Sequence, residues 1–571
     1  MEIRRAGVYM ELYTAGIDFG SLSGRCILVN LRTGREEATS VYEYPHAVMD
    51  ETLPDGTPLQ IDWCLQHPED YKEVLRYTIR DCMKQIGIDN SQIVGIGIDF
   101  TSCTILPILE DGTPLCMLEK YKSEPNAYVK LWKHHAAQPE ADELNRIAHE
   151  RGERFIHRYG DKISSEWMFP KIWQVLNESP EVYEDTYCFL EAADWIVKLL
   201  TGNLMRNNCS AGYKAIWHKK EGYPSKEFFK ALDERLENVI EDKMKGPVVP
   251  IGTKAGEITA EAAELTGLLQ GTAVAVAHLD AGGATVGAGI TTVGTMLIMM
   301  GTSSCHILLG ERECEVPGMC GVVEDGIIPG YIGYEAGQSC VGDHFQWATE
   351  NCTPAEYFRK AQENGQNIHE YLSELAQAKE PGESGVLALD WWNGNRSVLV
   401  DGKLSGLLIG CTLQTKAEDI YRALIEATAF GTRKIVETFE RNGVPVNEIV
   451  IAGGIAKKNP FAMQIYADVT GKDIKIAGSS QNAALSSTIW AALAAGSKAG
   501  GFDTLEEAVD RLSNVQDKKY TPNAEHEQVY DALYAEYEIL HDYFGRGENN
   551  VMKRLKKITE GIKEKKIATV R

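Results

Sequence analysis

A turn rich in glycine and hydroxyl residues occurs twice in this chain, each time directly after a run of apolar residues. The first copy is Gly16-Ile-Asp-Phe-Gly-Ser-Leu-Ser-Gly-Arg25 and the second is Met300-Gly-Thr-Ser-Ser-Cys-His306. Glycine lets main-chain N–H groups approach an anion closely, and Ser or Thr adds a hydroxyl donor. A single turn of this kind is as often a plain hairpin, so the argument depends on the pair. The two turns together predict a nucleotide held between two related halves.

The predicted elements follow one another in a similar order around both turns. Around the first turn we expect three strands, a helix and a strand, at 15–18, 25–30, 37–44, 67–86 and 93–98. Around the second we expect three strands, two helices and a strand, at 296–300, 306–309, 327–334, 341–350, 418–441 and 448–454. This order predicts an α/β fold with two halves of similar topology and a ligand crevice between them.

Two further segments have a distinct composition. Residues 126–245 read as helical and aromatic, and we expect most of their tryptophans to lie in a core that elaborates the first half. Residues 552–571 carry eight Lys or Arg against two Glu, which predicts a basic surface helix or tail. The apolar face of this segment is narrow, so a solvated helix is favoured over membrane binding.

Composition restricts the partners of the chain. Hydrophobic residues make up 44% and charged residues 25%, as in ordinary globular proteins. A formal net charge of −24 disfavours binding to nucleic acid or anionic lipid, so a nucleotide needs local positive charge or a metal ion. The thirteen cysteines show no paired spacing, which indicates reduced thiols and a cytoplasmic protein. We expect small-molecule partners, no nucleic acid and no membrane.

Three charged residues stand where phosphoryl transfer would need them. Asp280 ends the apolar run 273–279 and precedes a Gly/Ala-rich segment, so it can accept a proton from an incoming hydroxyl. Spacing alone leaves equally open that Asp280 only caps the following helix. Asp18 precedes the first turn and can hold Mg²⁺ through water. Arg25 can meet phosphate charge, although an Arg at the start of a strand is more often solvated.

At this point the chain resembles the FGGY carbohydrate kinases, a family built on actin-like, ribonuclease H-like ATPase domains. The segments that carry the resemblance are Gly16-Ile-Asp-Phe-Gly-Ser, Gly97-Ile-Asp-Phe-Thr-Ser-Cys-Thr104, Tyr128-Val-Lys-Leu-Trp-Lys-His-His135, Ser164-Ser-Glu-Trp167, Gly301-Thr-Ser-Ser-Cys305, Glu315-Val-Pro-Gly-Met-Cys-Gly321, Glu335-Ala-Gly-Gln-Ser339 and Asp390-Trp-Trp-Asn-Gly-Asn-Arg-Ser397. The phosphate turns are shared across the superfamily. Leu-Trp-Lys-His-His and Asn-Gly-Asn-Arg-Ser look specific to the branch that phosphorylates L-ribulose.

The resemblance implies ATP-dependent phosphorylation of L-ribulose to L-ribulose 5-phosphate in L-arabinose breakdown, with Mg²⁺ at Asp18. It makes Asp280 the catalytic base and a sugar contact, together with Ser102, Lys214 and Glu335. The residues that it assigns to ATP are Gly20, Ser21, Ser23, Arg25, Gly301, Thr302, Ser303, Gly342, Gln346, Gly454, Lys458 and Asn459. Lys458 stands where some sugar kinases have Asn, and Asn459 is the candidate substitute. Lys214, flanked by Tyr213 and Trp217, would otherwise read as a solvated surface lysine.

The expected organisation has three parts. Residues 1–285 form an N-terminal domain with the sugar site and the first phosphate turn. Residues 286–545 form a C-terminal domain with the second turn and the adenosine site, and a nucleotide cleft lies between the two domains. Residues 546–571 form the basic tail. Two rival functions remain: another pentulose or polyol kinase of the family, such as a D-ribulose or xylulose kinase, and a non-kinase actin-like ATPase. A homodimer is compatible with the sequence.

Overall fold

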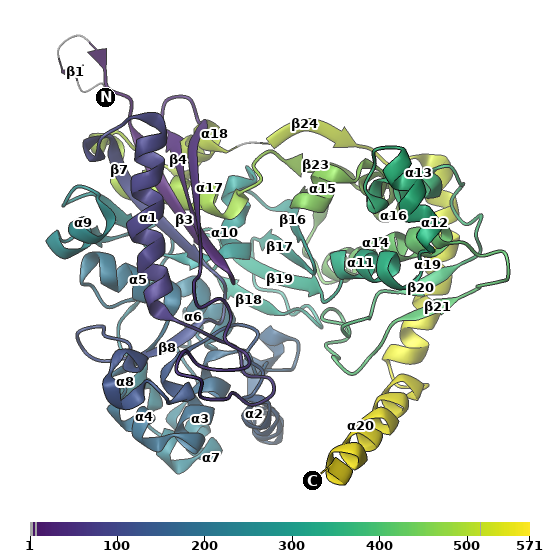
Figure 1. Ribbon diagram of the computed structural model, residues 1–571, viewed down its shortest axis with the longest axis horizontal. Helices are drawn as coiled ribbons and strands as arrows, with labels where there is room; N and C mark the ends of the chain where they lie inside the picture. The colour runs from purple at the N-terminus through teal and green to yellow at the C-terminus, as the bar shows by residue number, and fades with distance from the viewer. Residues whose placement is uncertain (1–3, 6–7, 514, 571) are drawn as a thin grey trace.

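The computed structural model describes residues 4–5, 8–513 and 515–570, and it consists of two α/β halves (Figure 1). Each half is built on a seven-stranded mixed sheet. The first sheet has the order β13-β14-β7-β3-β4-β5, with β15 beside β7. The second has the order β18-β19-β17-β16-β22-β23-β24. The predicted fold class, two α/β halves of similar topology, is confirmed.

The first sheet starts with the predicted meander. Its strands are β3 (Tyr13–Phe19), β4 (Ser23–Asn30), β5 (Glu36–Glu43), β7 (Ile93–Phe100), β13 (Lys254–Glu257), β14 (Ala273–Ala275) and β15 (His278–Leu279). Strands β3, β4 and β5 are antiparallel neighbours, and β7 runs parallel to β3. Helix α1 (Pro68–Ile86) lies between an N-cap at His67 and a left-handed Gly87, so the predicted helix is confirmed.

The second sheet repeats this arrangement. Its strands are β16 (Gly294–Met300), β17 (Ser304–Gly310), β18 (Gly321–Glu324), β19 (Ile332–Gln338), β22 (Val446–Ala452), β23 (Asp473–Ala477) and β24 (Val515–Tyr520). The strand predicted at 327–334 is wrong at its start. Asp325 closes a turn there, because its N–H donates to Tyr331 O and its carboxylate accepts from Gly330 N. The long helix α14 (Ala417–Arg441) agrees with the prediction.

One helix of the second half lies on the sheet of the first. Helix α17 (Asn482–Ala495) follows β23 and packs on β3 and β7. This contact needs glycine: a Cβ on Gly16 would lie 2.1 Å from Ala484 O, and one on Gly97 would lie 2.0 Å from Ser487 O. The predicted boundary between residues 285 and 286 stays a prediction, since the two halves interlock in space.

The segment predicted to be helical and aromatic does elaborate the first half. Its helices are α2 (Gln138–Arg151), α3 (Met168–Glu178), α4 (Pro180–Asp185), α5 (Ala192–Thr201), α6 (Asn208–Lys214), α7 (Lys226–Leu232) and α8 (Val239–Lys243). Trp63, Trp167 and Trp173 are buried in one core cluster with them.

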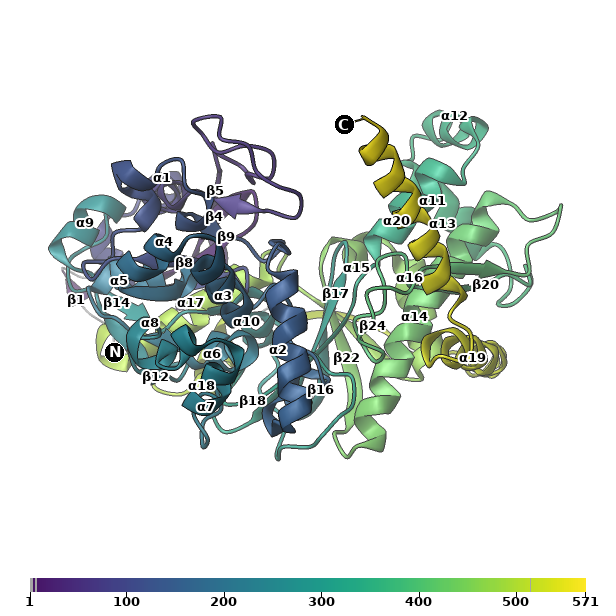
Figure 2. The ribbon, with the colours of Figure 1, turned by 90° about the horizontal axis from the view of Figure 1, so that it is seen from below.

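The chain ends in two helices. Helix α19 (Ala524–Gly545) runs along the second half, and α20 (Val551–Val570) projects from it (Figures 1 and 2). The predicted basic helix is therefore present as α20. None of the helices that the structure describes combines the length and the apolar character needed to span a membrane.

Candidate active site

The first glycine-hydroxyl turn joins β3 to β4. Gly20 N–H donates to Ser23 O at 2.9 Å, which closes the turn. The Ser21 hydroxyl accepts from Trp132 Nε1 at 3.0 Å, and its carbonyl accepts from Gln66 Nε2 at 2.8 Å. The turn is therefore held from outside by Trp132, a member of the Leu-Trp-Lys-His-His segment. Its main-chain geometry is set by the protein before any ligand arrives.

The second turn joins β16 to β17 in the matching place. Gly301 N–H donates to Ser303 O at 2.8 Å, and the first residues of α11 (Gly342–Asn351) donate back to the carbonyls of Gly301 and Thr302. A Cβ on Gly342 would lie 2.7 Å from Gly301 O, so only glycine permits this approach. The second turn and the start of α11 are thus one rigid unit.

The start of α15 (Gly454–Lys458) lies against the same turn. A Cβ on Gly453 would lie 2.1 Å from Met300 O, whereas one on Gly454 would meet no heavy atom of the described chain within 4 Å. The steric demand for glycine is therefore at Gly453, which the sequence reasoning did not select. Gly454 instead leaves open space beside the turn, where a ligand can fit.

Three carboxylates gather where parallel strands of the first sheet end. Asp18 of β3 lies directly opposite Asp99 of β7, and Asp99 in turn lies opposite His278 of β15. Asp280 follows β15. The sequence reasoning selected Asp18 and Asp280 but not Asp99. The signal was available, because the tetrapeptide Gly-Ile-Asp-Phe occurs at 16–19 and again at 97–100, and the two copies pair side by side.

Asp280 has the electrostatics of a general base. Burial, together with the charges of Asp18 and Glu335, raises the pKa of its carboxyl to about 7. The N–H of Ala281, which donates to Asp280 Oδ1 at 2.7 Å, and the charge of Lys214 act in the opposite direction. Asp280 is the first residue of α10 (Asp280–Gly287), whose N-cap is Leu279. It is therefore not the N-cap, although its carboxylate does accept one N–H of the first turn.

Lys214 and Glu335 meet across the two halves. Lys214 Nζ of α6 lies 3.0 Å from Glu335 Oε2 of β19, and both side chains are buried. Burial rules out the alternative that Lys214 is a solvated surface lysine. Arg396 also pairs with Glu335 Oε1. Lys214 and Arg396 together lower the pKa of the Glu335 carboxyl, so this carboxylate stays ionised between two cations. Arg396 was not among the predicted site residues.

Ser102 lies in a turn that buried polar groups hold in place. The next residue, Cys103, has a positive φ of 58°. Its carbonyl accepts from Lys171 Nζ at 2.6 Å, and Thr104 N–H donates to Glu191 Oε2 at 3.1 Å. Burial lowers the pKa of Lys171 to about 8. Lys171 therefore fixes the backbone beside Ser102.

Two of the residues assigned to ATP already have partners. Asn459 caps α16 (Pro460–Thr470), since its Oδ1 accepts from Ala462 N at 3.0 Å and its Nδ2 donates to Ser373 Oγ at 3.1 Å. Gln346, on the exposed side of α11, hydrogen-bonds to Glu350. Lys458 is exposed at the end of α15. The roles of these residues toward adenine stay predictions.

The residues around Asp18 fit a hydrated divalent cation. Arg25 Nε lies 3.3 Å from Asp18 Oδ2, so Arg25 neutralises this carboxylate in part. Asp99 Oδ1 is buried and has no hydrogen-bond partner in the described chain. Burial raises the pKa values of both Asp18 and Asp99, which shows that negative charge is costly there without a cation. Oxygen ligands and bound water are what Mg²⁺ prefers.

A second group of possible metal ligands lies near the start of α1. Within the described ranges, His46, His67 and Asp70 place ligand atoms within 4.8 Å of one another. The two imidazole rings stack with centroids 4.2 Å apart and planes at 19°. A metal ion lies close to the plane of each imidazole that binds it, so stacked rings cannot share one. His46 pairs with Asp70, and His67 caps α1, so this cluster is structural.

Comparison with known proteins agrees with this architecture. Residues 13–287 match the N-terminal domain of the FGGY family of carbohydrate kinases, and residues 296–495 match its C-terminal domain. A protein named ribulokinase from Halalkalibacterium halodurans is 56% identical over 545 residues, covering 95% of this chain and 97% of that protein. A ribulokinase from Bacillus licheniformis is 58% identical over 538 residues, covering 94% and 97%.

Solved structures share the fold at much lower identity. A gluconate kinase from Lactobacillus acidophilus superposes with a TM-score of 0.78 at 17% identity, covering 94% of this chain and 99% of that one. A xylulose kinase from Rhodospirillum rubrum superposes with a TM-score of 0.76 at 21% identity, covering 93% and 98%. At these identities the similarity concerns the fold alone.

Proposed function

The chain belongs to the FGGY family of carbohydrate kinases, and from that premise we propose that it transfers the γ-phosphoryl group of ATP to the terminal hydroxyl of L-ribulose. The product is L-ribulose 5-phosphate, and the reaction belongs to L-arabinose breakdown. The observation that carries the proposal is identity of 56–58% over about 95% of the chain to relatives named ribulokinase. The proposed reaction consumes ATP, and we therefore propose a cytoplasmic location for the protein.

The residues of the cleft have distinct tasks in this mechanism. Asp280, with a pKa near 7, accepts the proton of the sugar hydroxyl as that oxygen attacks phosphorus. The ammonium of Lys214 hydrogen-bonds sugar hydroxyls and stabilises the charge that develops on the phosphoryl group. Glu335, held ionised by Lys214 and Arg396, accepts hydrogen bonds from further hydroxyls. Lys214 and Glu335 come from different halves, so both halves of the protein bind the sugar.

The two turns position the nucleotide. Their main-chain N–H groups and hydroxyls bind the phosphates, and the open positions at Gly301 and Gly454 leave room for them. Mg²⁺, held through water beside Asp18 and Asp99, would neutralise charge on the β- and γ-phosphates. Closing of the cleft excludes water, which limits ATP hydrolysis without sugar.

A panel of sugars tests the substrate assignment. ADP release is followed by a coupled assay with L-ribulose, D-ribulose, D-xylulose, L-xylulose and the pentitols at equal concentration. The expected result is the highest kcat/KM for L-ribulose. A higher value for another ketopentose or a pentitol would favour the rival pentulose or polyol kinase. ADP release that no sugar stimulates would contradict kinase activity altogether.

A further inference from the structure

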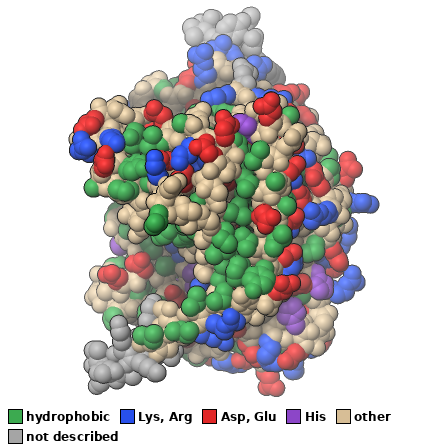
Figure 3. All heavy atoms as spheres, turned by 90° about the vertical axis from the view of Figure 1, so that its right-hand side faces the viewer, with side chains coloured by type: hydrophobic (Ala, Val, Ile, Leu, Met, Phe, Trp, Pro, Cys, Tyr) green, Lys and Arg blue, Asp and Glu red, His purple; other side chains and the backbone are tan. Residues whose placement is uncertain are grey.

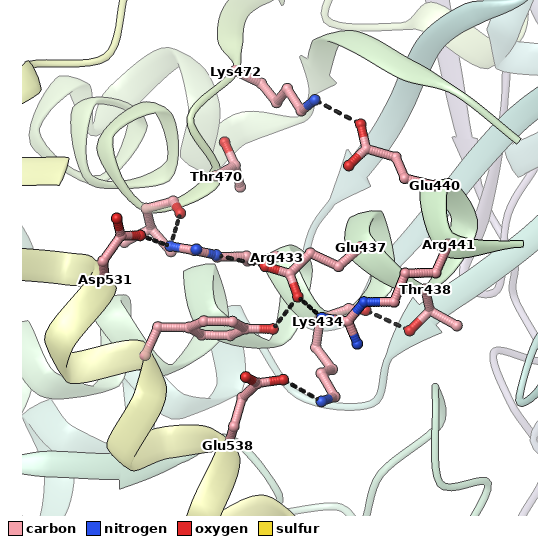
Figure 4. A network of polar contacts seen from close by, with 12 residues as sticks. Arg433, Lys434, Glu437, Thr438, Glu440, Arg441, Thr470, Lys472, Asp531 and Glu538 are labelled. Atoms are coloured by element: carbon pink, nitrogen blue, oxygen red, sulfur yellow. Dashed lines mark hydrogen bonds and ion pairs between the residues drawn. The ribbon is translucent and has the colours of Figure 1, made fainter. Parts of the chain in front are cut away.

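The lysines of the second half illustrate two common surroundings of an ammonium group. On the outer face of that half, Lys and Arg side chains lie at the surface among Asp and Glu (Figure 3). The buried Lys434 of α14 pairs with the carboxylate of Glu538 on α19 (Figure 4). Lys171, in the first half, differs from both. It is fully buried near the start of α3, and its ammonium contacts main-chain carbonyls.

The ammonium of Lys171 donates to carbonyls of two segments that are remote from each other in sequence. Nζ lies 2.6 Å from Cys103 O, 2.9 Å from Leu131 O and 3.4 Å from Lys130 O. A lysine ammonium has three N–H donors, so these contacts use all of them. The side chain thus fastens both segments to one point at the start of α3.

Each of the two segments adjoins a group of the candidate active site. Ser102, the predicted sugar contact, directly precedes Cys103. Trp132 directly follows Leu131, and its Nε1 donates to Ser21 Oγ of the first glycine-hydroxyl turn at 3.0 Å. The same ammonium is therefore connected to the predicted sugar site on one side and to a phosphate turn on the other.

The start of α3 also contacts a third group of the site. Trp167, the N-cap residue of α3, is buried, and Lys214 Nζ lies 5.6 Å from the centroid of its ring. At this distance an aromatic face attracts a cation. The N–H of Lys171 donates to Trp167 O at 3.4 Å, so the two residues share one helical turn. The end of α3 is thus a common support for several parts of the site.

We propose that Lys171 is a positioning residue that anchors the sugar site and the first glycine-hydroxyl turn at one point. The inference rests on the proposed phosphoryl transfer to a sugar. Lys171 acts through the carbonyls of Cys103 and Leu131, and thereby sets where Ser102 and Trp132 lie. Loss of the ammonium takes a donor from buried carbonyls in both segments at once, which favours a shift of both backbones. One substitution should therefore weaken the binding of both substrates.

Lys171→Met tests the proposal, because Met keeps the apolar body of the side chain and removes all three donors. We expect KM for the sugar and KM for ATP each to rise about tenfold, since the hydrogen bonds of a charged donor are lost. The kinetics use the sugar with the highest kcat/KM in the wild-type panel, so an error in the substrate assignment would leave this result unchanged. If Lys171→Met melts below the assay temperature, Lys171→Gln, whose amide keeps two donors, is judged by the same two KM values.

Lys243→Met is the matched control. Lys243 of α8 is also buried, and its Nζ donates to Thr186 O at 2.6 Å and to Glu184 O at 3.2 Å. These two carbonyls belong to the same half, but in sequence they adjoin none of the predicted site residues. The control variant should lower Tm as Lys171→Met does and should leave both KM values unchanged.

Double-mutant cycles distinguish positioning from a general loss of stability. Ser21→Ala removes the acceptor of the Trp132 Nε1 hydrogen bond, so it breaks the same chain of contacts as Lys171→Met. In kcat/KM for ATP, the double variant should be about threefold or more above the value that the product of the two single effects predicts. Ser102→Ala combined with Lys171→Met should show the same coupling in kcat/KM for the sugar.

Three results would overturn the proposal. The first is a folded Lys171→Met variant in which both KM values are unchanged or only one of them rises. The second is an equal rise of both KM values in Lys243→Met, which would assign the effect to lost stability. The third is a cycle in which the two single effects simply multiply, because independent sites behave in that way.

Discussion

The pH dependence of the reaction follows from the surroundings of Asp280. Only the ionised carboxylate can accept the proton of the sugar hydroxyl, so activity is lost as the pH falls through the pKa of this group. With a pKa of about 7, about one eleventh of the carboxyl is ionised at pH 6 and about ten elevenths at pH 8. We therefore expect kcat/KM to rise about tenfold between these two values.

The measurement uses the coupled ADP assay with both substrates far below their KM values, because kcat/KM then reports the pKa of the free enzyme. Lys214→Met removes a positive charge that lowers the pKa of Asp280. The midpoint should therefore move upward in that variant. Asp280→Asn is the control, because any residual rate of this variant should not rise with pH between 6 and 8.

The reasoning depends on burial of the carboxyl as the main cause of its raised pKa. An Asp in water titrates near 4. A profile that is flat between pH 6 and 8, with its midpoint near 4, would refute the electrostatic account of Asp280. A rise of kcat/KM centred near pH 7 that persists in Asp280→Asn would assign the titration to another group.

Three substitutions test other parts of the site. Asp280→Asn should lower kcat by about 10²–10⁴-fold while ATP affinity, measured by calorimetry, stays the same; unchanged turnover would remove Asp280 from the mechanism. Gly97→Ala places a methyl 2.0 Å from Ser487 O, so it should lower the free energy of unfolding by more than about 2 kcal/mol, which is measured as a lower Tm. Gly402→Ala, at an open position, is the control and should leave Tm unchanged. Gly454→Ala adds a methyl on the open side of the second turn, so KM for ATP should rise about tenfold with KM for sugar unchanged. A KM for ATP equal to that of the wild type would place the nucleotide elsewhere.

Several elements could be predicted because neighbouring residues encode them. Helix α1 begins after His67, which caps it, and ends at a glycine that adopts the left-handed conformation. The two glycine-hydroxyl turns connect antiparallel strands at the predicted places. The strand predicted from residue 327 failed because a carboxylate contact at Asp325 favours a turn over an extended chain. Local hydrogen bonds thus decide both the successes and this error.

The sequence alone determined the fold class and the positions of the two glycine-hydroxyl turns, and it selected Asp280 as the candidate base, since these depend on residue type and order along the chain. The tertiary structure decided how the groups act on one another. It places Asp99 beside Asp18, sets Glu335 between Lys214 and Arg396, and lays α17 on the sheet of the other half. The pKa of Asp280 depends on burial and on charges far away in sequence. Burial and Coulomb interactions depend on distances in space, and these distances exist only once the two halves have come together.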